Sequence, residues 1–276
     1  MPPLTHPRRG AGLAELVVAL ALSALLSMAG VAALIGVERY TRRAAVDDDA
    51  QRVLREVESV LAAELRAAAA DSITVRGDTA VDLFTGVATS VVCAVAGAVL
   101  VLPSDQAASG VPYLHVRTTP LAGDVLAAYD TAGAWHAARV DSAQWNADGA
   151  GCSTASGFRT AADSVARLRV LRLRIATELT VGAGAPVRLF RRGRYALIRG
   201  GDGSWGLGWR RCDELGVCGA SQPVAGPLAA PSEGGLVFQL AADGGSIEVR
   251  AATSPAGGYG ARREFTIALR HRETVP

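Results

Sequence analysis

Lysine is absent from this chain of 276 residues, and all 28 of its basic side chains belong to arginine. We interpret this as the codon bias of a GC-rich genome, which also accounts for the abundant alanine and glycine. The formal net charge is only +2, and aromatic residues make up 5% of the chain. Capture of nucleic acid needs basic residues interleaved with stacking aromatics, so we expect no nucleic-acid partner.

Motifs of catalysis and nucleotide binding are also missing. No G-x-S-x-G sequence places a nucleophile, and the glycine-rich residues 200–206 lack the lysine and the following helix of a phosphate loop. A hairpin turn is the simpler interpretation of that segment. We therefore expect no enzyme, no cofactor and no metal. Calcium binding by Asp202, Asp213 and Glu214 stays open as an alternative, although EF-hand spacing is absent.

One long apolar segment dominates the N-terminal part of the chain. Residues 11–37 contain a single charged side chain, Glu15. The segment exceeds the roughly 20 residues needed to cross a bilayer and the core of about 7–15 residues in a cleaved secretory signal. Inserting a carboxylate at mid-bilayer costs about 2.5–3.5 kcal/mol, so we expect Glu15 to have a charge partner and a function. Basic residues flank the segment on both sides: Arg8, Arg9, Arg39, Arg42 and Arg43.

A basic leader, Gly10, an apolar helix and a glutamate five residues after the glycine together resemble the N-terminal motif of type IV pilins and type II secretion pseudopilins. The resemblance implies that a prepilin peptidase cuts after Gly10 and that Ala11 becomes the N-methylated N-terminus. Glu15 is then the fifth mature residue, which in the family pairs with the N-terminal amine of a neighbouring subunit. Ala11 departs from the usual Phe or Met, and Ala32 stands where many major pilins carry proline.

Beyond the apolar segment the pattern becomes amphipathic. Aliphatic residues recur at three- and four-residue steps from Val46 to Leu65, and no proline or glycine interrupts residues 38–71. We expect an α+β protein in which one long helix, transmembrane and then amphipathic, packs on an antiparallel β-rich head in the pilin-like manner. The expected parts are a leader (1–10), a transmembrane helix (11–37), its amphipathic continuation (38–71) and the head (72–276).

After residue 71 the period changes from helical to extended. Short apolar segments separated by glycine and aspartate turns are typical of an antiparallel β structure. The order of elements over about residues 186–272 resembles the heads of the J-type minor pseudopilin and the W-type minor pilin. Predicted strands cover residues 72–76, 90–102, 113–117, 124–129, 135–140, 168–175, 187–190, 194–198, 206–210, 235–240, 246–251 and 264–270.

Four cysteines lie in the part that we expect outside the cytoplasm. An even number there predicts two disulfides. Cys212 and Cys218 enclose only five residues and are expected to pair, which leaves Cys93 for Cys152. A zinc site is the competing interpretation, and it is weaker because no C-x-x-C occurs and the histidines are scattered.

The resemblance implies a minor pilin or pseudopilin, a structural subunit that initiates or caps a type II secretion pseudopilus or a type IV pilus. Its partners would be other pilin or pseudopilin subunits, the prepilin peptidase, an inner-membrane assembly platform and membrane lipid. The chain would cross the inner membrane once, with a cytoplasmic N-terminus and a periplasmic head, before joining a fibre. Two alternatives stay open: a signal-anchored periplasmic binding protein or enzyme, and a component of a DNA-uptake pseudopilus.

Overall fold

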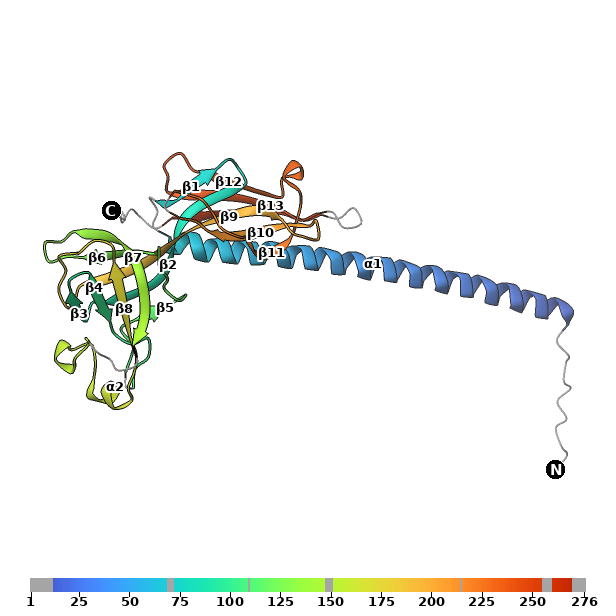
Figure 1. Cartoon of the computed structure of the whole chain (residues 1–276). Helices are drawn as coiled ribbons and strands as arrows, with labels where there is room; N and C mark the ends of the chain where they lie inside the picture. Colours follow the sequence, from blue (N-terminus) through green and yellow to red (C-terminus); the bar gives the residue numbers. More distant parts are fainter. Residues whose placement is uncertain are drawn as a thin grey trace, which may run out of the picture. The chain divides into compact units, whose positions relative to one another are not determined.

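A computed structural model describes residues 12–68, 72–108, 110–146, 151–213, 215–254 and 260–269, without the side chain of Ala14. The fold consists of a long N-terminal helix, α1 (Leu13–Ala67), and a large antiparallel β domain (Figure 1). The expected α+β class is therefore confirmed. The chain divides into two compact units, Met1–Ala50 and Gln51–Pro276, so the last part of α1 belongs to the same unit as the strands, which we call the head.

Every strand pairing in the described part of the chain is antiparallel. The elements after α1 are β1 (Thr74–Arg76), β2 (Ala80–Val91), β3 (Ala94–Ala96), β4 (Val99–Leu102), β5 (His115–Val116), β6 (Val125–Tyr129), β7 (Trp135–Asn146), the 3-10 helix η2 (Thr154–Ser156), α2 (Ala161–Val165), β8 (Val170–Ile175), β9 (Pro186–Arg199), β10 (Trp205–Arg211), β11 (Gln222–Leu228), the 3-10 helix η3 (Pro231–Glu233), β12 (Leu236–Leu240), β13 (Ser246–Ala252) and β14 (Arg262–Ala268).

The larger sheet curls round on itself. Its strand order is β1-β2-β9-β6-β7-β8-β4-β3, and β3 follows β2 after only Val92 and Cys93. The backbone N–H of Cys93 also donates to the carbonyl of Val101 in β4 at 2.7 Å. The chain thus runs directly from β2, next to one end of the strand order, into β3 at the other end, and this part of the sheet encloses an interior.

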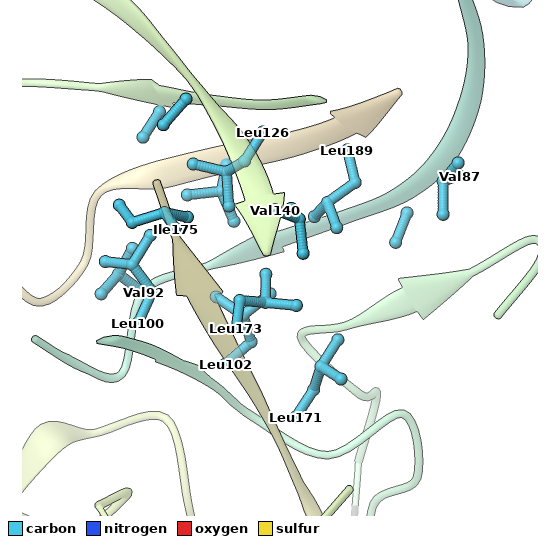
Figure 2. Close-up of a cluster of buried hydrophobic side chains, with 14 of the residues drawn as sticks. Val87, Val92, Leu100, Leu102, Leu126, Val140, Leu171, Leu173, Ile175 and Leu189 are labelled. Carbon is cyan, nitrogen blue, oxygen red and sulfur yellow. The ribbon is translucent and has the colours of Figure 1, made fainter. Parts of the chain in front are cut away.

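Aliphatic side chains fill this interior. Leu171, Leu173 and Ile175 point inward from β8, while the intervening Arg172 and Arg174 are exposed, as the alternating sequence predicts. Figure 2 shows these three residues converging with side chains from β2, β4, β6, β7 and β9. The labelled members of the cluster are Val87, Val92, Leu100, Leu102, Leu126, Val140, Leu171, Leu173, Ile175 and Leu189.

The long strand β9 connects this curled part of the sheet to the rest of the head. Its first half pairs with β6 and its second half with β10, while β2 runs along most of its length. β11 extends the sheet from β10, and β12, β13 and β14 form a separate three-stranded sheet. In Figure 1, β10, β11 and β13 lie in one group of strands and β6, β7 and β8 in another.

Several predicted strand boundaries are wrong. Residues 80–91 form β2 and residues 222–228 form β11, and neither strand was predicted. The segment 90–102 is the end of β2 followed by the hairpin of β3 and β4, which turns at Gly97 with a φ of 56°. The two strands expected at 187–190 and 194–198 are one continuous strand, β9. The short helix α2 was also missed.

A buried carboxylate, Asp82, connects β1, β2 and β9. Arg194 donates to both of its oxygens, at 2.5 Å and 3.0 Å, and Arg76 Nε donates at 3.2 Å. Burial acts to raise the pKa of Asp82, but hydrogen bonds and charge from Arg194 and Arg76 outweigh it and hold the pKa below its ordinary value of 3.8. Ionised Asp82 therefore stabilises the folded head.

We expect Asp82→Asn to lower the free energy of unfolding at pH 7 by about 1–3 kcal/mol, because Arg194 loses its charged acceptor. The folded pKa lies below the unfolded one, so this stabilisation is present above about pH 4 and is lost as the pH falls through the folded pKa. Urea unfolding of both proteins between pH 7 and pH 3 checks this. A difference that does not shrink below about pH 4 would contradict the assignment.

Candidate functional site

Of the residues in the predicted N-terminal motif, Glu15 lies in the described part of the chain, whereas Gly10 and Ala11 lie outside it. Glu15 occupies the first turn of α1, and the backbone N–H of Gly12 donates to its Oε2 at 3.2 Å. A carboxylate in the first turn also faces the positive end of the helix dipole, which is worth about 0.3–1 kcal/mol. The neutral N–H compensates the carboxylate in part, and among the described residues no cation pairs with it.

The helix that carries Glu15 exposes a large apolar surface. Leu13, Leu26 and Leu34 are 82%, 74% and 70% exposed. Residues 13–37 would span about 37 Å as a helix, more than the roughly 30 Å of a bilayer's hydrocarbon core. Near the N-terminus, α1 is long and apolar enough to cross a membrane, a test that signal sequences also pass. Such a surface requires cover by lipid or by other apolar helices.

Charged side chains follow the apolar segment directly. Glu38 and Arg42 form an exposed i,i+4 pair at 2.6 Å, and Arg39 and Arg43 continue the basic cluster. Exposed pairs of this kind contribute about 0.3–0.5 kcal/mol to a helix. This change from apolar to charged residues defines the expected membrane–water boundary at about residue 37.

The end of α1 is built into the head. Leu54, Val57, Leu61 and Leu65 have no exposed surface. Their spacing of three and four residues puts them on one helical face, as the amphipathic pattern predicts. Burying each of them stabilises the head by about 1.5–3 kcal/mol relative to exposure. The final turns of α1 are therefore part of the head's core.

Two ion pairs connect the same part of α1 to the β structure. Arg263 of β14 donates to Glu58 at 2.6 Å, and Arg117, directly after β5, pairs with Glu64. Sequence reasoning did not identify these partners, although Glu58 and Glu64 each border the buried face next to Val57 and Leu65. The pairs fix the rotation of the helix about its axis, since each reaches a different edge of the buried face.

Both predicted disulfides are present. Cys93 bonds Cys152 across 59 residues of sequence, and Cys212 bonds Cys218 around the five-residue loop. The first closes a long loop of the curled sheet, and crosslinks of this length remove several kcal/mol of conformational entropy from the unfolded chain. Cysteine pairing of this kind is typical of an extracytoplasmic head.

The carboxylates considered for calcium serve local turns. Asp202 Oδ1 accepts from the backbone N–H and the hydroxyl of Ser204, which shapes the predicted hairpin turn between β9 and β10. Asp213 Oδ1 accepts from the N–H of Val217 at 2.8 Å, inside the disulfide loop. Glu214 lies outside the described residues. Within the described ranges, no three His, Cys, Asp or Glu side chains gather closely enough to hold a metal ion.

One histidine has an acidic partner. His136 Nε2 lies 2.6 Å from Asp130 Oδ2, and both residues belong to the hairpin between β6 and β7. Asp130 also accepts from the N–H groups of Ala132 and Ala134, so its carboxylate organises the turn. Backbone and His136 hydrogen bonds hold the pKa of Asp130 below its ordinary value. The arrangement is that of a turn, and the pair does not resemble a base positioned against a nucleophile.

The chain was compared with protein-family models, with curated proteins and with solved structures. No family model, no curated protein and no solved structure matches it. The functional argument therefore depends on the residues and geometry of this chain and on the resemblance of its N-terminal motif.

Proposed function

We propose that this chain is a minor pilin or pseudopilin, a structural subunit that initiates or caps a type II secretion pseudopilus or a type IV pilus. Cleavage after Gly10 by a prepilin peptidase would release Ala11 as the new N-terminus, which would then be N-methylated. The observation that carries the proposal is Glu15, the one charged side chain in an exposed apolar helix of membrane length, five residues after a glycine that ends a basic leader.

Glu15 gives this helix a reason to associate with others. The N–H of Gly12 is its hydrogen-bond donor in the single chain, and a neutral donor offsets only part of the cost of a carboxylate in an apolar environment. The ammonium group of Ala11 in a neighbouring subunit would supply a full opposite charge and a stronger hydrogen bond. Such a pair sets the axial register between adjacent helices, because it forms at one relative position only.

The attachment of α1 to the head supports the same role. Four fully buried aliphatic residues and two ion pairs hold residues 51–67 in the head. A helix that associates with its neighbours through its apolar segment would therefore carry its head along. The head exceeds 200 residues, which favours a J-like or W-like minor subunit near the fibre tip over a repeated major subunit.

The proposed location and partners follow from this role. Before assembly the chain would sit in the inner membrane with its N-terminus in the cytoplasm and its disulfide-bonded head outside. It would bind other pilin or pseudopilin subunits, the prepilin peptidase, the assembly platform and lipid. The chain would act in fibre assembly, without a catalytic step or a cofactor.

We expect Glu15→Ala to leave membrane insertion and cleavage intact but to lower the amount of the chain in sheared fibres by at least about tenfold, since the charge that pairs with a neighbouring N-terminus is gone. The measurement compares the fibre and membrane fractions by quantitative immunoblotting in the native host.

Glu38→Ala is the matched control, because it removes a glutamate from the same helix outside the apolar segment and leaves fibre content unchanged. Equal fibre content in Glu15→Ala and the parent protein would contradict the assembly role. An uncleaved chain that stays in the membrane in every variant would instead favour a signal-anchored protein, and loss of transformation alone would favour DNA uptake.

A further inference from the structure

A polar cavity of about 380 Å³ lies within the head, where the last turns of α1 face the sheet. The strands β2, β9, β10 and β11 contribute to its wall, together with the segment that follows β5. All of its lining residues belong to the unit Gln51–Pro276. The side chains that matter for its chemistry are Glu64, Arg117, Thr118, Tyr195, Trp209 and Gln222.

The charges at this cavity are balanced. Arg117 donates to Glu64 Oε1, and the side chain of Glu64 is only 15% exposed. Burial raises the pKa of Glu64, against the opposing charge and hydrogen bond of Arg117. Arg191, also in the wall, has its charge matched by Asp124 at 2.8 Å. A charged ligand would disturb one of these pairs, whereas a neutral ligand would not.

Several uncharged polar groups in the wall have no partner. Among the described residues, none donates to or accepts from the hydroxyls of Thr118 and Tyr195, the indole N–H of Trp209 or the side-chain amide of Gln222. Tyr195 is 6% exposed, and burial raises its pKa, so its hydroxyl stays protonated as a donor. Thr118 and Gln222 are exposed and Trp209 is half-buried, so water reaches these groups, and a ligand with several donors and acceptors can take the place of that water.

Two aromatic residues form one side of the cavity. Tyr195 and Trp209 are directly opposite each other in the pairing of β9 with β10, so they share a face of the sheet. The lack of a side chain at Gly193 leaves room for the indole ring, because a Cβ atom there would lie 2.5 Å from Trp209 Nε1. Tyr195 is almost fully buried and Trp209 is half-buried, so the indole offers the larger aromatic surface beside the unpartnered polar groups.

We propose that this cavity binds a neutral polyhydroxylated ligand, a single unit of a saccharide. The C–H face of a sugar ring packs on the indole of Trp209. Its hydroxyls, each both donor and acceptor, bond Gln222, Thr118 and the outer atoms of the Glu64–Arg117 pair. This binding function goes beyond fibre assembly and does not depend on it, because the cavity lies entirely within the head.

The test uses the full chain in lipid nanodiscs, which avoids detergents with sugar headgroups. Glucose, galactose, N-acetylglucosamine and their disaccharides are titrated by calorimetry and by tryptophan fluorescence. We expect saturable binding of at least one sugar with a change in emission. Trp209→Phe and Gln222→Ala each weaken it by at least about tenfold, since the first replaces the indole with a smaller ring and the second removes the amide that bonds a sugar hydroxyl.

Trp205→Phe is the matched control, because it changes the same residue type on the same strand without touching the cavity wall, and it leaves the affinity unchanged. Gln222 is exposed on the edge strand β11, so its variant keeps the fold even if Trp209→Phe does not. The proposal is overturned if no sugar in the panel binds, if Trp205→Phe weakens binding as much as Trp209→Phe, or if the cavity binds acetate or methylammonium instead.

Discussion

Replacing Arg191 with methionine is expected to lower the free energy of unfolding of the head by about 3–5 kcal/mol. Asp124 has no exposed surface, and Arg191 donates to both of its oxygens at 2.8 Å. The same guanidinium also donates to the carbonyl of Thr119 at 2.8 Å. Without it, the partners of the buried carboxylate among the described residues are the N–H of Leu121 and the more distant Arg211, at 3.8 Å.

The four tryptophans all lie in the head, so their fluorescence during urea unfolding reports this stability without interference from the apolar helix. Arg263→Met is the matched control, because it breaks the partly exposed pair with Glu58 and should cost at most about 1 kcal/mol. The double variant Arg191→Met with Asp124→Leu should recover much of the loss, since it removes both buried charges. A loss as small as that of Arg263→Met would contradict the role assigned to the buried pair.

The helix was predictable because its causes are local. The apolar composition of residues 13–37 and the aliphatic spacing around Leu54 and Leu61 act within a few turns of one element. The change at residue 37 from apolar to charged was predictable for the same reason. The helix ends at Ala67, four residues before the expected boundary, because alanine-rich residues do not mark a helix end.

The strands that were missed depend on contacts between distant residues. β2 contains Asp82, and aspartate is more typical of turns than of strands. Its ion-pair partner in the head, Arg194, lies 112 residues away in the sequence. β9 was divided at residues 191–193, where the charge of Arg191 is matched by Asp124 and Gly193 makes room for an indole ring. Neither relation is visible in a local window of sequence.

β11 shows how an edge position overrides composition. Pro223, Gly226 and Pro227 argue against a central strand, because proline cannot donate to a ladder. In the described part of the chain, β11 pairs with β10 alone, so the N–H groups on its other side are not needed for a strand ladder. Both disulfides were predictable, since spacing and number left few pairings. The polar cavity was not, because its walls come from six separate segments of the chain.

The largest expected effect on function comes from Gly10. Replacing it with leucine should abolish removal of the leader, because the proposed peptidase site requires the small residue that the pilin-like motif supplies there. Without cleavage, Ala11 keeps its peptide bond and offers no ammonium group to Glu15 of another subunit, so the chain should also be missing from fibres. Intact mass and N-terminal sequencing of protein from native membranes measure both steps. The parent chain should begin at Ala11, with or without a methyl group, and the variant should retain residues 1–10.

Gly36→Leu separates this effect from a general change in the helix. It makes the same substitution late in the apolar segment, where a Cβ atom meets nothing within 4 Å, so processing should be unchanged. A block in Gly10→Leu with normal cleavage in Gly36→Leu would locate the requirement at the leader, and the remaining question would be which fibre the subunit joins. A parent chain that begins at Met1, or one cut near residues 29–33, would contradict prepilin processing. Glu15 would then be only a residue in the first turn of a membrane-anchor helix, where its carboxylate accepts from the N–H of Gly12.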